Sequence, residues 1–320
     1  MASGSKKIIF AALAGNALIS ITKFIASAIT GSSAMMSEGI HSLVDTGNQA
    51  LLLYGLKRAK RPADKDFPFG HGKEIYFWSF VVAILIFAVG AGISIYEGIQ
   101  HVIHPSPVES PMVNYIVLGL AMIFEGWAWL MALREFRALK GKTGYFKAVK
   151  EGKDPTVFVV LFEDSAALLG LVVAALGLFL GQITGLEVFD GIASILIGCI
   201  LGGTAIWLAY ETKSLLIGEA ASPEVVDAIG EMAGRLVTVE NVNEVLTLHM
   251  GPEYVLVNVS LDFANDASAA DVEHAVECLD RGIRSRFPLV KRIFIEAESR
   301  EHAGEAPPIE LPAESEDQGA

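Results

Sequence analysis

The stretch HSLVDTGNQ, residues 41–49, places ionisable side chains inside a run that otherwise has the apolar composition of a membrane-spanning helix. Such side chains are costly in hydrocarbon, so they are rare there and usually functional. His41 and Asp45 are four residues apart and therefore share one face of a helix. An imidazole nitrogen and a carboxylate oxygen on one face supply half of a tetrahedral site for a zinc-like divalent ion. The stretch predicts a membrane helix that carries half of a metal site.

The composition of the 320-residue chain is that of a membrane protein with an acidic soluble part. Hydrophobic residues make up 52% and charged residues 19% of the chain, and the mean hydropathy is +0.47. Residues 1–211 hold 16 acidic and 16 basic side chains, whereas residues 212–320 hold 21 acidic and 8 basic ones. The acidic part argues against nucleic acid as a partner. Cys199 and Cys278 do not indicate a disulfide framework.

Six segments have the length and apolarity of membrane spans, which need about 20 residues each. Lys and Arg gather before the first segment and in the connections 57–75 and 134–155, and the other three connections contain none. The positive-inside rule then places both termini and both basic connections in the cytoplasm. No transit peptide is visible, so the expected location is a bacterial inner membrane. The predicted spans cover about residues 8–29, 35–56, 76–101, 112–133, 156–180 and 188–210.

Small residues recur within the predicted spans. Without a hydrophobic drive between helices in lipid, such residues allow close backbone packing. We therefore expect packing rather than function at Gly90, Gly92, Gly198, Gly202 and Gly203.

The polar residues of the second span form one stripe. At ~100° per residue, Glu38, Asp45 and Asn48 all fall within about 60° of His41. The alternative to a metal site is a buried hydrogen-bonded seam between helices. A seam rarely needs two carboxylates and an imidazole, so the stripe favours a metal site.

The depth of the acids predicts where the other half of the site lies. Asp45 is ~15 Å below the outer surface and Asp164, in the fifth span, is ~14 Å from the inner surface. Both are near the midplane of a core about 30 Å thick, where alternating-access transporters bind their substrate. Asp164, with its neighbour Glu163, is therefore the candidate partner of Asp45. Glu125 is a candidate for an access path, and Asp190 is expected to cap its own helix.

At this point the chain resembles the cation diffusion facilitator family of zinc-type metal/proton antiporters, and within it the zinc transporter nine-like branch. The resemblance covers roughly residues 8–298 and is carried by four runs. They are HSLVDTGNQ at 41–49, FPFGHGKE at 67–74, EDSAALLG at 163–170 and DGIASILIG at 190–198. It implies that His41, Asp45 and Asp164 bind the transported metal.

The chain departs from the family pattern at the fourth ligand. Zinc members commonly carry His or Asp four residues before the fifth-helix Asp, and here that residue is Val160. Zinc prefers four ligands, so Glu163, Asn48 or water has to complete the set. More oxygen and less nitrogen shifts the preference toward Mn²⁺ or Fe²⁺.

The family's loop site is also incomplete in this sequence. Asp64 and His71 match the family pattern, whereas Phe67 replaces its second histidine. We retain Asp64 and His71 as candidate ligands of a loop metal. The alternative is that His71 bonds the backbone where the loop joins the helix.

The last third predicts a small α+β domain. Helices are expected at 222–237 and 268–287 and strands at 245–250, 254–263 and 290–297, in the order αββαβ. This order resembles the family's cytosolic ferredoxin-like domain, which implies a homodimer. We assign it residues 212–298, after a transport domain at 1–211 and before an acidic tail at 299–320 that is expected to be disordered.

The domain's own metal chemistry is expected to be weak. No histidine stands at the positions that match the family's cytosolic metal ligands, so a metal site there is predicted to be absent. His249 and His274 are expected to be a strand and a surface histidine rather than ligands. The matching positions are Asn243, Ser260, Glu296 and Glu298.

These features together predict a transporter, with Zn²⁺ leaving the cytoplasm in exchange for protons. Mn²⁺, Fe²⁺, Co²⁺ or Cd²⁺ carried by the same mechanism is the alternative. An enzyme is not expected, because neither HExxH nor GxSxG occurs in the sequence. A metal sensor without flux is a third class, and the midplane acids argue against it, since a sensor can bind metal in water at less cost.

Overall fold

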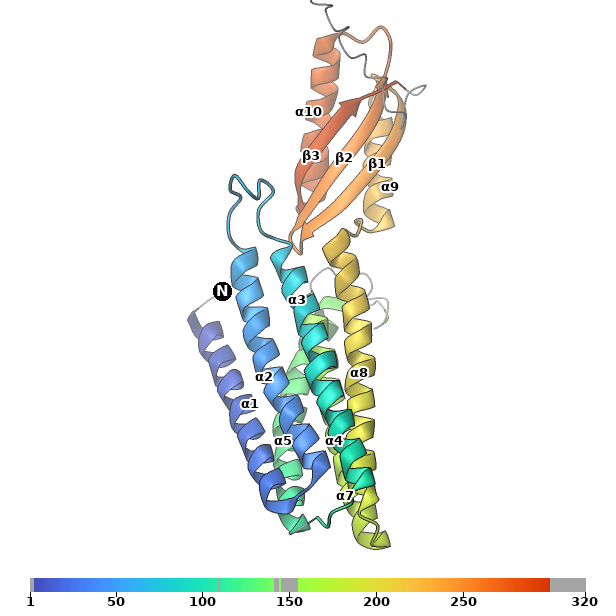
Figure 1. The fold of residues 1–320 in the computed structure, drawn as a ribbon. Helices are drawn as coiled ribbons and strands as arrows, with labels where there is room; N and C mark the ends of the chain where they lie inside the picture. The colour runs from blue at the N-terminus through green and yellow to red at the C-terminus, as the bar shows by residue number, and fades with distance from the viewer. Residues whose placement is uncertain (1–2, 109, 141–143, 145–154, 300–320) are drawn as a thin grey trace, which may run out of the picture. The chain divides into compact units, whose positions relative to one another are not determined.

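The computed structural model describes residues 3–108, 110–140, 144 and 155–299. The chain forms two compact units, each with its own core: the first runs to Gly218 and includes Met250–Pro252, and the second holds Glu219–His249 and the chain from Glu253 on. The first unit is a bundle of long helices (Figure 1). Its elements are α1 (Ser3–Thr30), α2 (Ser33–Ala59), α3 (Glu74–Leu85), the π-helix Ile86–Ala91, α4 (Gly92–Ile103), α5 (Pro111–Lys140), α7 (Pro155–Thr184) and α8 (Val188–Ile217).

Four helical stretches of the described residues are long and apolar enough to cross a membrane. They are Glu74–Ile103, Pro111–Ala138, Phe158–Thr184 and Val188–Ile217. They match the third to sixth predicted spans. Within α1 the described apolar stretch is Asn16–Thr30, and α2 carries the polar stripe that lowers its hydropathy. Four of the six predicted spans are thus confirmed as membrane-capable helices.

Helix α2 lies in the middle of the bundle. It contacts α1, α3, α4, α7 and α8, so the polar stripe on α2 faces other helices and not the surroundings. The outward side of α1 is apolar instead, with Leu18, Ile21, Ile25 and Ile29 more than half exposed at helical spacing. The ionisable groups of α2 therefore lie inside the bundle, within a mainly apolar core, and the outward side of α1 is apolar, as expected for helices in lipid.

Helices α4 and α8 approach closely through glycines. A Cβ on Gly198 would lie 2.6 Å from Cγ1 of Ile95, and one on Gly191 would lie 2.9 Å from the carbonyl oxygen of Gly98. The packing role predicted for Gly198 is therefore confirmed. At Gly203 it is wrong, because no atom lies within 4 Å of the corresponding Cβ position. Just before α4, the π-helix widens the backbone by one residue, a feature frequent at functional sites.

The second unit is a three-stranded sheet with two helices. Its elements follow the predicted order: α9 (Pro223–Gly234), β1 (Val239–Gly251), β2 (Tyr254–Phe263), α10 (Ala269–Arg286) and β3 (Val290–Ala297). The strand order is β1-β2-β3, and β2 pairs in parallel with β3, for example Val257 with Ile293. The central strand β2 supplies the most buried side chains, and Ile229 of α9 and Ile283 of α10 complete the core. The predicted strands at 254–263 and 290–297 are confirmed, whereas β1 begins six residues earlier than expected.

Helix α10 begins with a reciprocal cap. Ser268 accepts a hydrogen bond from the amide of Asp271, and the Asp271 carboxylate accepts one from the amide of Ser268. The bonds from the Ser268 hydroxyl and amide lower the pKa of Asp271 below its ordinary value. Such a capping box fixes where a helix starts. The predicted disordered tail falls, apart from Ser299, outside the described residues.

Candidate metal site in the helical unit

The polar stripe of α2 is buried as the sequence predicts. Glu38, His41 and Asn48 are each at most 1% exposed. His41 Nε2 lies 3.4 Å from Asp45 Oδ2 within the same helix. His41 and Asp45 therefore form a buried imidazole–carboxylate pair.

Both acids of α7 lie near Asp45, and Glu163 contacts the Asp45 carboxyl directly. Glu163 is buried and accepts a 2.6 Å hydrogen bond from Nδ2 of Asn48. Asp164 instead lines a cavity that it shares with Asp45. Consecutive helical residues are ~100° apart, which explains this division. Asn48 and Glu163, the two candidates for a replacement ligand, thus bind each other.

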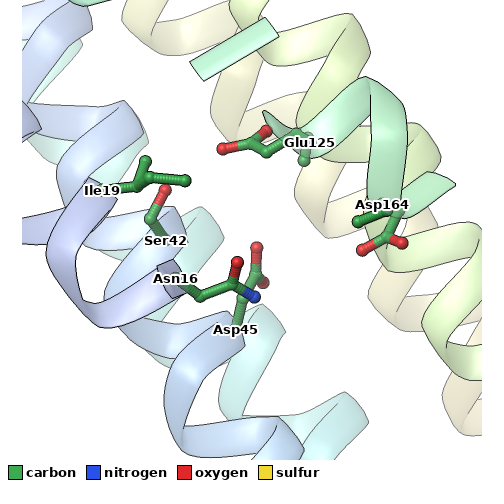
Figure 2. A pocket seen from close by; sticks show the side chains of 8 residues that line it. Asn16, Ile19, Ser42, Asp45, Glu125 and Asp164 are labelled. Atoms are coloured by element: carbon green, nitrogen blue, oxygen red, sulfur yellow. The ribbon is translucent and has the colours of Figure 1, made fainter. Parts of the chain in front are cut away.

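Asp45 and Asp164 meet at a small cavity of about 20 Å³. A space of this size holds one water-sized species. In Figure 2 the carboxylates of Asp45, Glu125 and Asp164 come from three different helices, α2, α5 and α7, around it. The cavity is lined by Asn16, Ile19, Ser42, Asp45, Glu125, Ala128, Asp164 and Ala167.

The predicted ligands are close together but do not form a coordination sphere. Within the described ranges, no three His, Cys, Asp or Glu side chains have the spacing of a metal site. His41 contacts Asp45 but is not among the residues that line the cavity. Val160 packs against the apolar core and offers no donor atom. Asp45 and Asp164 therefore line one cavity, and His41 contacts Asp45 without lining the cavity itself.

A second buried cluster adjoins the cavity and centres on Lys23 of α1. Its ammonium donates to Glu38 Oε2 at 2.9 Å, to Ser42 Oγ at 2.8 Å and to Glu125 Oε1 at 2.8 Å. The side chains of Lys23 and Glu38 are fully buried. Gly170 of α7 makes room for the Glu38 carboxylate, because a Cβ there would overlap Glu38 Oε1. The single buried ammonium thus comes from α1 and is bound by side chains of α2 and α5, and a glycine of α7 leaves space for one of the carboxylates.

Lys23 is not among the candidates that the sequence pattern predicts. A charged residue 15 positions before Glu38 in an apolar run is the same signal that singled out His41 and Asp45. Asn16 and Ser42, which also line the cavity, carry no such signal, since uncharged polar residues are common in membrane helices. Glu125 lies at the cavity and in the Lys23 cluster, whereas an access path was expected for it.

Asp190 caps a different helix from the one expected. Its carboxylate accepts hydrogen bonds from the amides of Ser33 and Ala34 and from the hydroxyls of Ser32 and Ser33, at the start of α2. The prediction that Asp190 caps its own helix is therefore wrong. The free amides at the start of α2 gain a charged acceptor from α8. This bond ties the helix that carries His41 and Asp45 to α8.

The loop candidates Asp64 and His71 bind each other. His71 is buried, and its Nε2 lies 2.9 Å from Asp64 Oδ2. This bond, followed by the backbone amides of Phe67 and Asp66, lowers the pKa of the Asp64 carboxyl. Glu74 lies 3.8 Å from His71 Nδ1 but is bound by Arg58. A loop metal at Asp64 and His71 stays a prediction. Nε2 of His71 is bonded to Asp64, whereas its Nδ1 is buried without a hydrogen-bond partner among the described residues.

The family-matched positions of the second unit form a hydrogen-bond network. Asn243 donates to Ser260 Oγ at 3.1 Å, and Ser260 donates to Glu298 Oε2 at 2.9 Å. Glu296 accepts from Asn258 at 3.2 Å. His249 lies buried on β1, and His274 lies exposed on α10, where the sequence places a strand and a surface histidine. Whether these positions bind metal stays a prediction.

Comparison with known proteins identifies the family. The cation efflux transmembrane domain model matches residues 9–217. The mouse (Mus musculus) protein named proton-coupled zinc antiporter SLC30A9, mitochondrial, is 35% identical over 263 residues, which are 81% of this chain and 46% of that protein. Metal tolerance protein C4 of Arabidopsis thaliana is 31% identical over 263 residues, 81% of this chain and 57% of its own length.

A bacterial relative matches over most of both chains. The cation-efflux pump FieF of Cronobacter sakazakii is 26% identical over 272 residues, 85% of each chain. The chain spans about half the length of the mouse relative. Its membrane-capable helices, its buried His–Asp pair and the domain match agree. The chain therefore belongs to the cation efflux, or cation diffusion facilitator, family of multi-pass membrane transporters, and not to a class of enzymes.

Proposed function

We propose that this protein carries a divalent metal cation, Zn²⁺ in the first place, out of the cytoplasm in exchange for protons. The observation that carries the proposal is the cavity in the helical unit, which Asp45 of α2 and Asp164 of α7 line together. The mouse relative is named a proton-coupled zinc antiporter, which supports Zn²⁺ and proton coupling. His41, Asp45 and Asp164 are the proposed ligands.

Binding requires His41 to join the cavity. Its Nε2 is 3.4 Å from Asp45 Oδ2, and both ring nitrogens are buried without a hydrogen-bond partner among the described residues. An imidazole that makes no other bond is free to turn toward a cation held by Asp45. Asn48 and Glu163 bond to each other, which makes Asn48 the weaker ligand candidate. Glu163 also contacts the Asp45 carboxyl and therefore remains a candidate ligand.

Proton exchange follows from the chemistry of these ligands. A metal binds neutral imidazole and ionised carboxylates, so metal binding releases any protons that the empty site holds. When the site opens to the other side, protons replace the metal. A site near the membrane midplane that opens alternately to each side exchanges one for the other.

The oxygen-rich lining of the cavity supports a second candidate ion. Asp45, Glu125 and Asp164 supply carboxylates and Asn16 and Ser42 neutral oxygens, a donor set that suits Mn²⁺ or Fe²⁺ better than one with more nitrogen or sulfur does. Export of Mn²⁺ or Fe²⁺ by the same mechanism is therefore the alternative.

The proposal includes six spans, both termini in the cytoplasm and a homodimer in a cell membrane. The exposed apolar stripe on α1 supports α1 as a span. The basic connections 57–75 and 134–155 support the orientation. The ferredoxin-like assignment of the second unit, with its homodimer, is supported by the element order α9-β1-β2-α10-β3.

The test is metal flux into liposomes that contain the purified full-length chain. Zn²⁺ flux is expected in the wild type, and Asp45→Asn should abolish it without loss of folded protein. The matched control is Glu97→Gln, a half-buried acid of α4 away from the cavity, which should transport normally. Undiminished flux in Asp45→Asn would overturn the site, and metal binding without flux would indicate a sensor. Competition with Mn²⁺, Fe²⁺, Co²⁺ and Cd²⁺ decides the ion.

A further inference from the structure

The Lys23 cluster contains one ammonium and two carboxylates. All three ammonium protons have acceptors, namely Glu38 Oε2, Ser42 Oγ and Glu125 Oε1. Lys23 and Glu38 are fully buried and Glu125 is 13% exposed. A single positive charge balances only one of the two carboxylates. The second carboxylate therefore needs another cation when it is ionised.

The two carboxylates differ in what their second oxygen faces. Glu38 Oε1 also lacks a hydrogen-bond partner among the described residues, but it lies against the backbone of α7 at Gly170, where there is no space even for a Cβ. Glu125 lines the cavity with Asp45 and Asp164, and its Oε2 is buried without a hydrogen-bond partner among the described residues. Glu38 is thus confined to Lys23, whereas Glu125 reaches both Lys23 and the cavity.

Asp45 presents a matching oxygen to the same space. Its Oδ1 is also buried and lacks a hydrogen-bond partner in the described part of the chain. A buried unsatisfied carboxylate oxygen is costly, and a cation between Asp45 and Glu125 would satisfy both. The cavity holds one water-sized species. Its size and its free oxygens are therefore suited to one cation.

We propose that Glu125 is a further ligand of the transported cation and that Lys23 is a tethered cation that holds Glu125 while the cavity is empty. This inference rests on the proposed function. Metal arriving in the cavity takes over Glu125 from the Lys23 ammonium, which stays with Glu38 and Ser42. The set of His41, Asp45, Asp164 and Glu125 then supplies the four donors that Zn²⁺ prefers, without any contribution from Val160.

A purely structural ion cluster makes the opposite prediction about metal affinity. In that account, Glu38 and Glu125 are equivalent acceptors for Lys23, and loss of either one affects metal binding alike. In our proposal only Glu125 touches the metal, and Lys23 competes with the metal for it. The two carboxylates can therefore be separated by variants that change the cluster's formal charge equally.

The test compares K23M/E38Q with K23M/E125Q, which carry the same formal charge as each other and as the wild-type cluster. The full-length chain in detergent is titrated with Zn²⁺ and, separately, with Mn²⁺ in a calorimeter. K23M/E38Q keeps Glu125 and removes its competitor, so it should bind at least as tightly as wild type. K23M/E125Q should bind at least about tenfold more weakly, because even partners of metal ligands contribute 10–100-fold.

Single variants provide a second measurement if a double variant does not fold. Glu125→Gln should weaken metal binding by the same factor, whereas Lys23→Met, which frees Glu125 from its competing ammonium, should not. Equal affinities within either pair of variants would overturn the role of Glu125. If the wild type itself neither binds nor moves Zn²⁺ or Mn²⁺, the proposed function fails. If it does and the pair is equal, only the assignment of Glu125 fails.

Discussion

Replacing Lys23 by methionine tests whether the helical unit really encloses an ionised cluster. The substitution keeps an unbranched side chain, one atom shorter than that of lysine, and leaves Glu38 and Glu125 without their shared ammonium. Breaking a buried ion pair from one side costs about 3–5 kcal/mol, because an uncompensated buried charge remains. Removing all three charges together, as in K23M/E38M/E125M, leaves no such charge. The triple variant should therefore be as stable as wild type or more stable.

The assay is unfolding of the full-length chain in dodecyl maltoside by added sodium dodecyl sulfate, followed by tryptophan fluorescence. All four tryptophans lie before Gly218, so the signal reports on the helical unit alone. The expected order is a loss of about 3–5 kcal/mol for K23M and recovery in the triple variant. Wild-type stability in K23M would refute the buried cluster. A triple variant as unstable as K23M would mean that packing, rather than unpaired charge, explains the loss.

Three further predictions concern single positions. Val160→His adds a nitrogen ligand one turn before Asp164 and should raise the Zn²⁺/Mn²⁺ affinity ratio at least about tenfold; an unchanged ratio in calorimetry would mean that residue 160 does not reach the metal. Gly170→Ala places a Cβ on Glu38 Oε1 and should lower the free energy of unfolding by about 1–3 kcal/mol in the same assay. Gly203→Ala, where no atom lies within 4 Å of the new Cβ, should be neutral or stabilising. Equal effects of the two substitutions would contradict the close contact at Gly170. Asp190→Asn should cost about 1–3 kcal/mol and speed amide hydrogen exchange at the start of α2; faster exchange confined to the start of α8 would restore Asp190 as a cap of its own helix.

The sequence predicts those features that depend on one helix at a time. His41 and Asp45 follow from helical spacing and from the cost of ionisable groups in lipid, and Asp164 follows from counting residues along its span. The same cost rule applies to Lys23, so this residue was within reach of sequence reasoning. Its role depends on Glu125, which is 102 residues away along the chain. Only the packing of α1 against α2 and α5 reveals this pairing.

The sequence pattern does not predict features that depend on which helices are neighbours. An aspartate in the first turn of α8 has the sequence signature of a cap for that helix, and nothing local indicates that it bonds the start of α2. Likewise, Glu163 is consecutive with Asp164, and only the neighbouring helix α2 decides that its partners are Asn48 and Asp45. Helical periodicity gives the face of a side chain, and tertiary packing decides its partner.

The most direct test of the central claim is uphill metal accumulation driven by a pH gradient. Liposomes containing the full-length chain start with equal Zn²⁺ on both sides and an acidic interior, and internal Zn²⁺ is followed with a trapped fluorescent indicator. Exchange of protons for metal through Asp45 and Asp164 predicts that Zn²⁺ rises inside above its external concentration. It also predicts that the rise vanishes when a protonophore is added or when Asp45 is replaced by Asn. Zn²⁺ that stays at its external concentration whatever the pH gradient would contradict the account.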